Sequence, residues 1–122
     1  MKLNKSKTYT IGLLILIVMA GLTAYLVFKP RPGNSLDYFA RCLSEKGLVM
    51  YGLYSCPHCQ AEKELFGSSF KYVNYVECSE NPGKCTAEGI NAVPTWIEPG
   101  GERLVGTQSL DNLSSVSGCK LN

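Results

Sequence analysis

The chain has 122 residues with 12 basic side chains, 10 acidic side chains and six cysteines, which is enough for one small domain and a short extra element. Its net charge of +2 is divided unevenly, because five basic residues and no acidic residue precede Leu36, whereas seven basic and ten acidic residues follow from there on. An acidic domain of this kind offers no basic face to nucleic acid, so we exclude nucleic-acid binding.

An apolar run without charge occupies residues 11–28, and the absence of charge extends back to Thr8. As a helix, residues 8–28 would span roughly 30 Å, the thickness of the hydrocarbon part of a bilayer. We therefore expect a transmembrane anchor over 11–28, preceded by a short basic segment over 1–10. A cleavable signal peptide is the alternative, but it needs only about 7–15 apolar residues and then small ones. Here the apolar run continues past the small residues to Phe28, which favours the anchor.

The charges beside this segment and the cysteines after it predict the compartment. Three lysines precede the segment and two basic residues follow it, so the positive-inside rule narrowly favours a cytoplasmic N-terminus. All six cysteines lie downstream, which is typical of an oxidising space where disulfides persist. We expect a single-pass protein of the cell membrane with its domain outside the cytoplasm.

A linker and two elements follow the apolar segment. Residues 29–35 contain two prolines, a glycine and polar side chains, which predict a linker. Ser35 can cap a helix over about 36–46, which Gly47 would end. The mostly apolar run over 48–54 is typical of a buried strand.

The rest of the chain alternates between helical and strand patterns. Pro57 suits the first position of a helix, which would run to Phe66 before Gly67 stops it. The remaining expected elements are a strand at about 71–76, a short helix after the turn at 81–83, strands at 95–97 and 103–105, and a closing helix at 109–116. This order predicts an α/β domain over 36–122, with a mixed four-stranded sheet covered by helices on both faces.

The sequence Cys56-Pro-His-Cys59 lies at the junction of the first strand and its following helix. If Cys56 caps this helix, free N–H groups and the positive end of the helix dipole favour its thiolate, the attacking form in disulfide exchange. Cys59 lies one turn further on, within reach to resolve a mixed disulfide, and His58 adds a positive charge or a donor. A stabilised thiolate makes the disulfide a stronger oxidant, which favours disulfide donation. Glu62 and Glu64 are expected on the solvated face of the helix.

Several segments together resemble a known superfamily. Cys56-Pro-His-Cys59 after a strand, with Ala92-Val-Pro-Thr-Trp96 downstream, resembles the thioredoxin superfamily, and the Pro-His dipeptide is that of DsbA-type oxidases. The longer pattern is similar to the thioredoxin-like domain associated with bacterial vitamin K epoxide reductase homologues; it adds Met50-Tyr-Gly52, Lys63-Glu-Leu-Phe-Gly67 and Tyr75-Val-Glu-Cys78. The match covers about 36–119 and implies a thioredoxin-like three-layer sandwich.

The resemblance also implies roles for residues around the two cysteines. Pro57 belongs to the catalytic motif, and Pro94 is expected to be cis and to lie against the active-site disulfide. Val93 would offer backbone groups to a bound substrate strand. Tyr54 can line the same groove, although ordinary packing is the simpler interpretation of the aromatic side chains.

The chain departs from the resembled proteins in two ways. Thioredoxin and DsbA carry a buried acidic residue, used in proton transfer, six positions before the first cysteine. Here that position is Met50, so any proton relay must differ. The quinone-reacting membrane domain of the reductase homologues needs several helices, so we expect a vitamin K epoxide reductase-like or other membrane redox partner to be a separate protein.

The other four cysteines allow three pairings. Cys78 with Cys85 would close a short polar loop, and the resembled subgroup has a cysteine pair there. A structural role for this pair is favoured over a second redox relay. Cys42 on the first helix and Cys119 after the last could join the two ends of the domain, but sequence alone does not establish their separation.

Other classes of protein fit the sequence less well. A zinc module could use Cys56, Cys59, Cys78 and Cys85, but the second pair is spaced C-x6-C instead of the usual C-x2–4-C. A catalytically idle scaffold would not need an intact CxxC. The sequence therefore favours an extracytoplasmic thiol–disulfide oxidoreductase, with a reductase or isomerase as the alternative. It would act on reduced or misoxidised exported proteins, with no metal and no cofactor besides its own redox-active disulfide.

Overall fold

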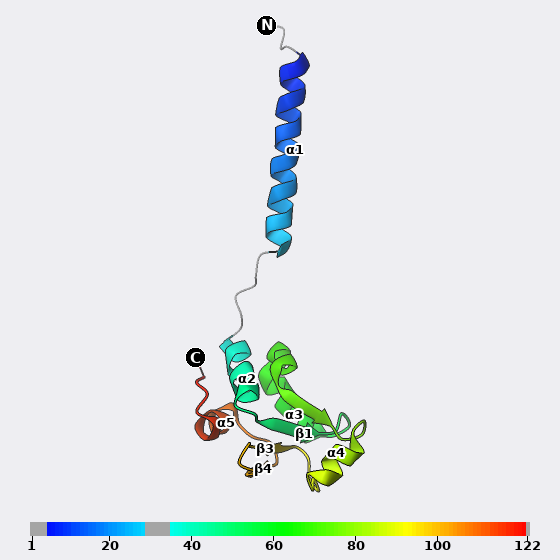
Figure 1. Ribbon diagram of the computed structural model, residues 1–122, viewed down its shortest axis with the longest axis vertical. Coiled ribbons are helices and arrows are strands. Elements are labelled where there is room, and N and C mark those ends of the chain that lie inside the picture. The colour runs from blue at the N-terminus through cyan, green and yellow to red at the C-terminus, as the bar shows by residue number, and fades with distance from the viewer. Residues whose placement is uncertain (1–4, 29–34, 122) are drawn as a thin grey trace. The chain divides into compact units, whose positions relative to one another are not determined.

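The computed structural model describes residues 5–28 and 35–121, and the chain divides into two units, Met1–Pro32 and Gly33–Asn122. The first unit contains helix α1 (Lys5–Phe28) (Figure 1). Over Lys7–Val27 this helix has a mean hydropathy of 2.4 and no buried side chain. By length and composition it is a candidate membrane span, although a signal sequence has the same features. The expected linker lies outside the described residues, apart from Ser35.

The second unit is an α/β domain whose elements follow the predicted order, with one addition. They are α2 (Ser35–Glu45), β1 (Val49–Gly52), α3 (Pro57–Phe66), the 3₁₀-helix η1 (Gly67–Tyr72), β2 (Asn74–Glu77), α4 (Pro82–Ala87), β3 (Thr95–Ile97), β4 (Arg103–Val105) and α5 (Leu110–Ser117) (Figure 1).

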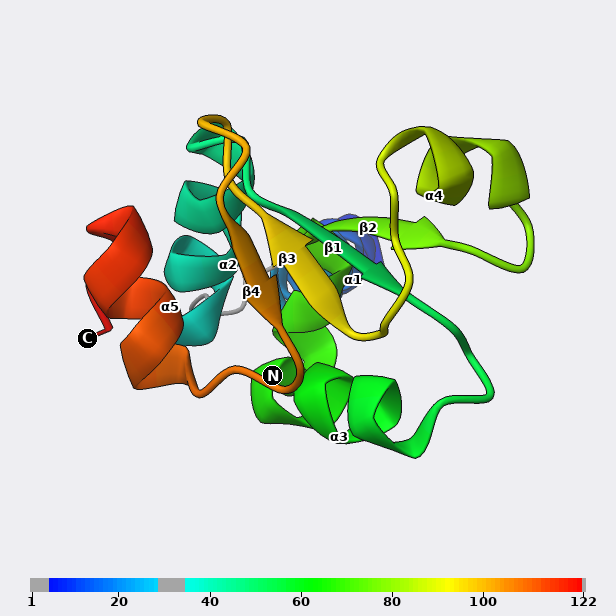
Figure 2. The ribbon, with the colours of Figure 1, turned by 90° about the horizontal axis from the view of Figure 1, so that it is seen from below.

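The four strands form one mixed sheet in the order β2-β1-β3-β4 (Figure 2). Strand β1 pairs with β2 in parallel and with β3 antiparallel, and β4 pairs with β3 antiparallel. In this register Met50 lies between Tyr75 and Trp96. The expected mixed four-stranded sheet is confirmed. Its interior strand β1 ends at Gly52, and three residues separate it from the Cys56–Cys59 segment.

Alternation of side chains along the strands produces a separate core on each face of the sheet. Met50 and Trp96 point to the main cluster. Buried residues of three helices and of the segment after α5 complete this cluster: Phe39, Ala40 and Leu43 of α2, Cys59 and Phe66 of α3, Leu113 of α5, and Cys119. Tyr51 and Ile97 point to the other face, where they meet Cys85 of α4. Figure 2 shows α3 and α4 on opposite sides of the sheet. The expectation of helices on both faces is confirmed.

The structure corrects the expected strand at 71–76, because β2 begins only at Asn74. Gly67, with φ +54°, ends α3, and the chain then forms η1. The Ser44 hydroxyl of α2 donates to the Tyr72 carbonyl and accepts the Asn74 N–H at 3.0 Å. Contacts with α2 therefore hold the first residues of the expected strand away from the sheet, a long-range effect that the local pattern does not contain.

Candidate active site

The Cys56–Cys59 segment connects β1 to α3 and begins the helix as predicted. Cys56 is the N-cap, with φ −85° and ψ 117°, and Pro57 is the first helical residue. The Cys56 sulfur accepts the Cys59 N–H at 3.4 Å, and the Cys56 carbonyl accepts the Gln60 N–H at 3.0 Å. Proline at the first helical position costs no hydrogen bond, because the N–H of any residue at that position has no partner within the helix. The sulfur of Cys56 thus lies at the free N–H groups of α3.

Cys56 is a partly exposed thiol in an environment that favours its ionised form. A hydrogen bond with the Cys59 side chain lowers the pKa of Cys56, and the backbone N–H groups of Cys59 and His58 lower it further. A lowered pKa raises the fraction of thiolate, which is the nucleophilic form.

Cys59 has the opposite environment. Its side chain is fully buried between α3 and the sheet. Burial is the main cause that raises the pKa of Cys59 to about 11, and the neighbouring Cys56 adds to it, while the Leu53 N–H and the charge of Lys63 oppose the shift. The pair therefore combines one accessible, readily ionised sulfur with one shielded sulfur that keeps its proton at neutral pH.

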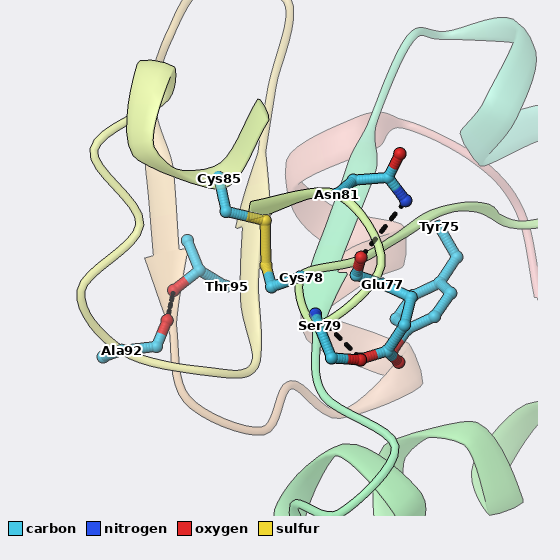
Figure 3. The surroundings of a disulfide bond; sticks show 8 residues. All are labelled: Tyr75, Glu77, Cys78, Ser79, Asn81, Cys85, Ala92 and Thr95. Atoms are coloured by element: carbon cyan, nitrogen blue, oxygen red, sulfur yellow. Dashed lines mark hydrogen bonds between the residues drawn. A yellow bond between two sulfur atoms is a disulfide. The ribbon is translucent and has the colours of Figure 1, made fainter. Parts of the chain in front are cut away.

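The loop before β3 approaches Cys56 from the other side. The Val93–Pro94 peptide bond is cis, and the Cys56 thiol lies 3.8 Å from the Val93 carbonyl oxygen, to which it donates. Pro94 is buried, and the Thr95 hydroxyl donates to the Ala92 carbonyl at 2.8 Å, which fixes the loop (Figure 3). The structure thus brings the Val93 carbonyl to Cys56, with Pro94 as the next residue of the same loop.

A cavity of about 210 Å³ lies beside this loop. It is lined by Leu53, Cys78, Cys85, Ile90, Asn91, Ala92 and Val93. Val93 both lines the cavity and touches Cys56, so the cavity adjoins the reactive sulfur. Tyr54 and His58 are exposed beside Cys56, and the Tyr54 carbonyl accepts the Gln60 side-chain amide at 2.5 Å.

Two disulfides join the other four cysteines in the combination that the sequence favoured. Cys42 of α2 bonds Cys119 after α5 with a Cα–Cα distance of 5.9 Å, and Cys78 bonds Cys85 of α4 with 5.7 Å (Figure 3). Both distances are usual for a disulfide. The zinc-module alternative loses two of its four thiolates to the second bond. Within residues 5–28 and 35–121, no group of three or more His, Cys, Asp or Glu is arranged around a metal position.

The structure also corrects the expectation for Glu62, which is fully buried, whereas Glu64 is exposed. Glu62 follows Cys59 by three residues and therefore lies on the same, inward face of α3. Its Oε1 accepts the Trp96 indole N–H at 2.6 Å and the Gln108 N–H at 3.1 Å, while its Oε2 has no hydrogen-bond partner. Burial raises the pKa of Glu62 despite these two donors.

Tyr75 of β2 lies close to Cys59, and its partner Glu77 lies on the same strand; the sequence analysis named neither as a site residue. The Tyr75 hydroxyl donates to Glu77 Oε2 at 2.6 Å (Figure 3). Tyr75 and Glu77 pair in register with Met50 and Gly52 of β1, so they share the face of the sheet that carries Cys59. The signal in the sequence was their i, i+2 spacing on one strand, but only the structure shows which side chain of α3 they face.

The chain was compared with protein families and with curated proteins. No family model matches it. It is 33% identical over 138 aligned residues to the protein named thiol-disulfide oxidoreductase LTO1 of Arabidopsis thaliana. The match covers 89% of this chain and 36% of the plant protein, so the chain spans about a third of the relative's length. The chain is therefore similar to a thiol–disulfide oxidoreductase, and a dithiol at a helix N-terminus accompanied by two disulfides is consistent with a redox protein of that kind.

Proposed function

We propose that this chain is a thiol–disulfide oxidoreductase in which Cys56 attacks and Cys59 resolves. The observation that carries the proposal is the asymmetry of the pair: Cys56 is accessible with a lowered pKa, whereas Cys59 is buried with a raised one. Disulfide exchange needs two sulfurs of different exposure, because one must contact the substrate and the other must stay shielded until the mixed disulfide forms.

The exchange proceeds in two balanced steps. In the oxidising direction, a substrate thiolate attacks Cys56 Sγ, the Cys56–Cys59 bond breaks, and Cys59 leaves as a thiolate that takes up a proton. A second substrate thiolate then attacks the substrate sulfur of the mixed disulfide, and Cys56 leaves as a thiolate. The substrate loses two electrons and gains a disulfide, while the enzyme pair becomes reduced. The reverse sequence reduces a substrate disulfide.

The environment of Cys56 favours the oxidising direction. The N–H groups that stabilise its thiolate stabilise the reduced pair, and this makes the Cys56–Cys59 disulfide the better oxidant. The Pro-His dipeptide of DsbA-type oxidases agrees with this direction, and His58 would add to it through its imidazole. We assign the domain a thioredoxin-like fold of the vitamin K epoxide reductase-associated type. The mixed sheet, the helix beginning at Cys56 and the loop of Val93 and Pro94 support this assignment.

The substrate strand is proposed to lie along the loop of Val93 and Pro94. The cavity of about 210 Å³ next to Val93 would receive one apolar side chain of that strand, and Tyr54 would border it. The substrates are reduced or misoxidised exported proteins. The apolar α1, with its basic flank, would anchor the domain on the extracytoplasmic side of the cell membrane, and a membrane redox partner of the vitamin K epoxide reductase type would reoxidise the pair.

The proposal is tested by mixing the oxidised 122-residue chain, in detergent, with a reduced and unfolded secreted protein. Disulfide formation in the substrate is followed by mass after thiol alkylation. We expect Cys56→Ser and Cys59→Ser each to abolish the transfer, and the double variant Cys78→Ser/Cys85→Ser to retain it. Transfer that depends on Cys78 and Cys85 would instead assign the chemistry to the second pair. Reduction of a disulfide-containing substrate with no oxidation of a reduced one would favour the reductase alternative.

A further inference from the structure

Cys59 is buried, and the two cysteines alone provide no group that exchanges its proton with solvent. In every cycle Cys59 must lose or gain a proton, yet its side chain is fully buried and its thiol is protonated at neutral pH. The place where the resembled proteins carry a buried acidic residue is occupied by Met50, whose buried thioether cannot exchange protons. Another group must therefore connect the Cys59 sulfur with solvent.

The structure brings the Tyr75 hydroxyl to Cys59 across Gly52. A Cβ atom at residue 52 would lie 3.2 Å from Cys59 Sγ and 3.1 Å from the Tyr75 hydroxyl oxygen. The separation between Cys59 Sγ and the Tyr75 hydroxyl oxygen is therefore at most the sum of these two distances. One bridging water can span such a separation. Gly52 has no positive φ, so the glycine is required by the close approach of the two side chains and not by its backbone.

The hydroxyl of Tyr75 is connected onward to a carboxylate at the surface of the domain. It donates to Glu77 Oε2 at 2.6 Å, and Glu77 Oε1 accepts the Ser79 hydroxyl at 2.6 Å (Figure 3). Partial burial raises the pKa of Glu77, but the hydrogen bonds from Ser79 and Tyr75 outweigh it and hold the pKa below its usual value. Glu77 is therefore ionised at neutral pH. Burial, together with the hydrogen bond to Glu77, raises the pKa of Tyr75, so Tyr75 can give its proton to Glu77 only as it receives one from Cys59.

We propose that Tyr75 and Glu77 form the proton relay of Cys59, in place of the buried acidic residue at position 50. This inference rests on the proposed function. When Cys59 attacks a mixed disulfide on Cys56, its thiol proton passes to the Tyr75 oxygen, directly or through one water, while the Tyr75 proton passes to Glu77. The new Cys59–Cys56 bond forms, the Cys56–substrate bond breaks, and the substrate leaves as a thiolate. Glu77 then releases the proton to solvent, and the reverse path protonates Cys59 when it leaves.

Other charged groups near Cys59 are less well placed for this role. Lys63 lies with its ammonium 3.9 Å from the centre of the Tyr75 ring, where its charge favours the Cys59 thiolate. Glu62, one turn along α3, is buried, and its Oε1 is held by Trp96 and Gln108. Glu62 is fully buried, whereas Glu77 is half-exposed. The experiment nevertheless includes Glu62, because its Oε2 lacks a partner.

The relay is tested by the two-step reaction of the full chain, in detergent, with 5,5′-dithiobis(2-nitrobenzoate). The chain is used with Cys56 and Cys59 reduced and the other two disulfides intact. Attack by Cys56 releases one thionitrobenzoate at a rate that depends on reagent concentration. Attack by Cys59 on the resulting mixed disulfide releases the second at a rate that does not. The second phase therefore measures the Cys59 step alone.

We expect Tyr75→Phe to slow the second phase by about 100-fold at pH 7 and to leave the first unchanged, since general acid–base groups commonly contribute about 100-fold or more. Its residual rate should rise about tenfold per pH unit between pH 6 and 9, because hydroxide must then remove the proton, whereas the rate of the unmodified chain should change less. Glu77→Gln keeps an acceptor for Tyr75 and should give the same altered slope. Tyr72→Phe removes a hydroxyl from η1 and should match the unmodified chain.

Each other result decides between the two proposals. Two normal phases in Tyr75→Phe at every pH would overturn the relay and leave the proposed function intact, as would a slow second phase in Glu62→Gln alone. A Tyr75→Phe rate reduced by the same factor at all pH values would show a structural role and also overturn the relay. Release of a single thionitrobenzoate by the unmodified chain would mean that Cys59 does not resolve, and the proposed function itself would be wrong.

Discussion

At the scale of single residues, the site is defined by two chemically identical side chains that the fold makes different. Cys56 and Cys59 are separated by one helical turn, but the first caps α3 in contact with solvent and the second faces the main cluster. The Cys59 side chain and backbone N–H groups donate hydrogen bonds to the Cys56 sulfur, whereas desolvation acts on the Cys59 sulfur, so the two pKa values move in opposite directions. In the proposed function, position within one turn of helix therefore determines which cysteine attacks.

This difference predicts selective alkylation. With the other two disulfides intact, iodoacetamide should label Cys56 with a pH midpoint below the usual thiol value of about 8.5, because the lowered pKa increases the thiolate fraction. Cys59 should remain unlabelled until well above pH 9. The measurement is the rate of carbamidomethylation at each cysteine by peptide mass between pH 5 and 10. Equal rates at the two sites would contradict the assignment.

Glu62 carries a prediction for stability against pH. Its pKa is raised by burial, so between the usual value of about 4.3 and the raised value the folded chain binds more protons than the unfolded chain. Stability from this residue is therefore highest below the usual pKa and declines as pH rises through the raised pKa. Glu62→Gln has no such proton to lose.

Denaturant midpoints of the unmodified chain and of Glu62→Gln, measured from pH 4 to pH 8, check this sign. The stability of the unmodified chain relative to the variant should fall with increasing pH. A relative stability that rises over the same range would mean that Glu62 is a stabilised carboxylate with a lowered pKa.

At the scale of elements, the short closing helix depends on its ends. The Ser109 hydroxyl accepts the Asn112 N–H at 3.1 Å, and Gly118, with φ +72°, ends α5 in the left-handed conformation. Ser109→Ala removes this cap and should cost about 1 kcal/mol of unfolding free energy. Ser109→Asp is the matched control, because an aspartate caps equally well. A loss in both variants would show that the hydroxyl has a role other than capping.

Local pattern predicted the elements well and the long-range contacts poorly. Capping and stop signals were sufficient for α3, where Pro57 opens the helix and Gly67 closes it. They were insufficient after Gly67, because a hydrogen bond from α2 to Tyr72 converts the expected start of a strand into η1. The inward turn of Glu62 was missed for a similar reason: its indole partner is 34 residues away on β3.

In the candidate site too, local sequence pattern predicted the elements but not the long-range contacts. A strand-to-helix junction with CxxC is a local signal, and it correctly predicted that Cys56 caps α3 and that Cys59 lies in its first turn. The approach of Tyr75 to Cys59 depends on the parallel pairing of β1 with β2 and on the absence of a side chain at Gly52. Neither condition can be read from the segment that contains Tyr75.

At the scale of the whole domain, the two disulfides should contribute unequally to stability. Cys42–Cys119 links residues 77 apart and joins α2 to the end of the chain, whereas Cys78–Cys85 links residues 7 apart. The loss of chain entropy in the unfolded state predicts about 4.5 kcal/mol from the first bond and about 2.5 kcal/mol from the second. Thermal unfolding of the two double Cys→Ser variants should show the larger decrease in Tm for the first pair. The reverse order would contradict the structural role of Cys42–Cys119.

The proposed function requires that Cys56 and Cys59 form a reversible, oxidising disulfide. The most direct measurement is its reduction potential, obtained by equilibrating the 122-residue chain in detergent with glutathione buffers and quantifying alkylated Cys56 and Cys59 by mass. We expect a two-electron transition at about −120 to −180 mV, the range of DsbA and protein disulfide isomerase. A potential near about −270 mV, that of thioredoxin, would contradict disulfide donation. No transition at these two cysteines would contradict the redox function itself.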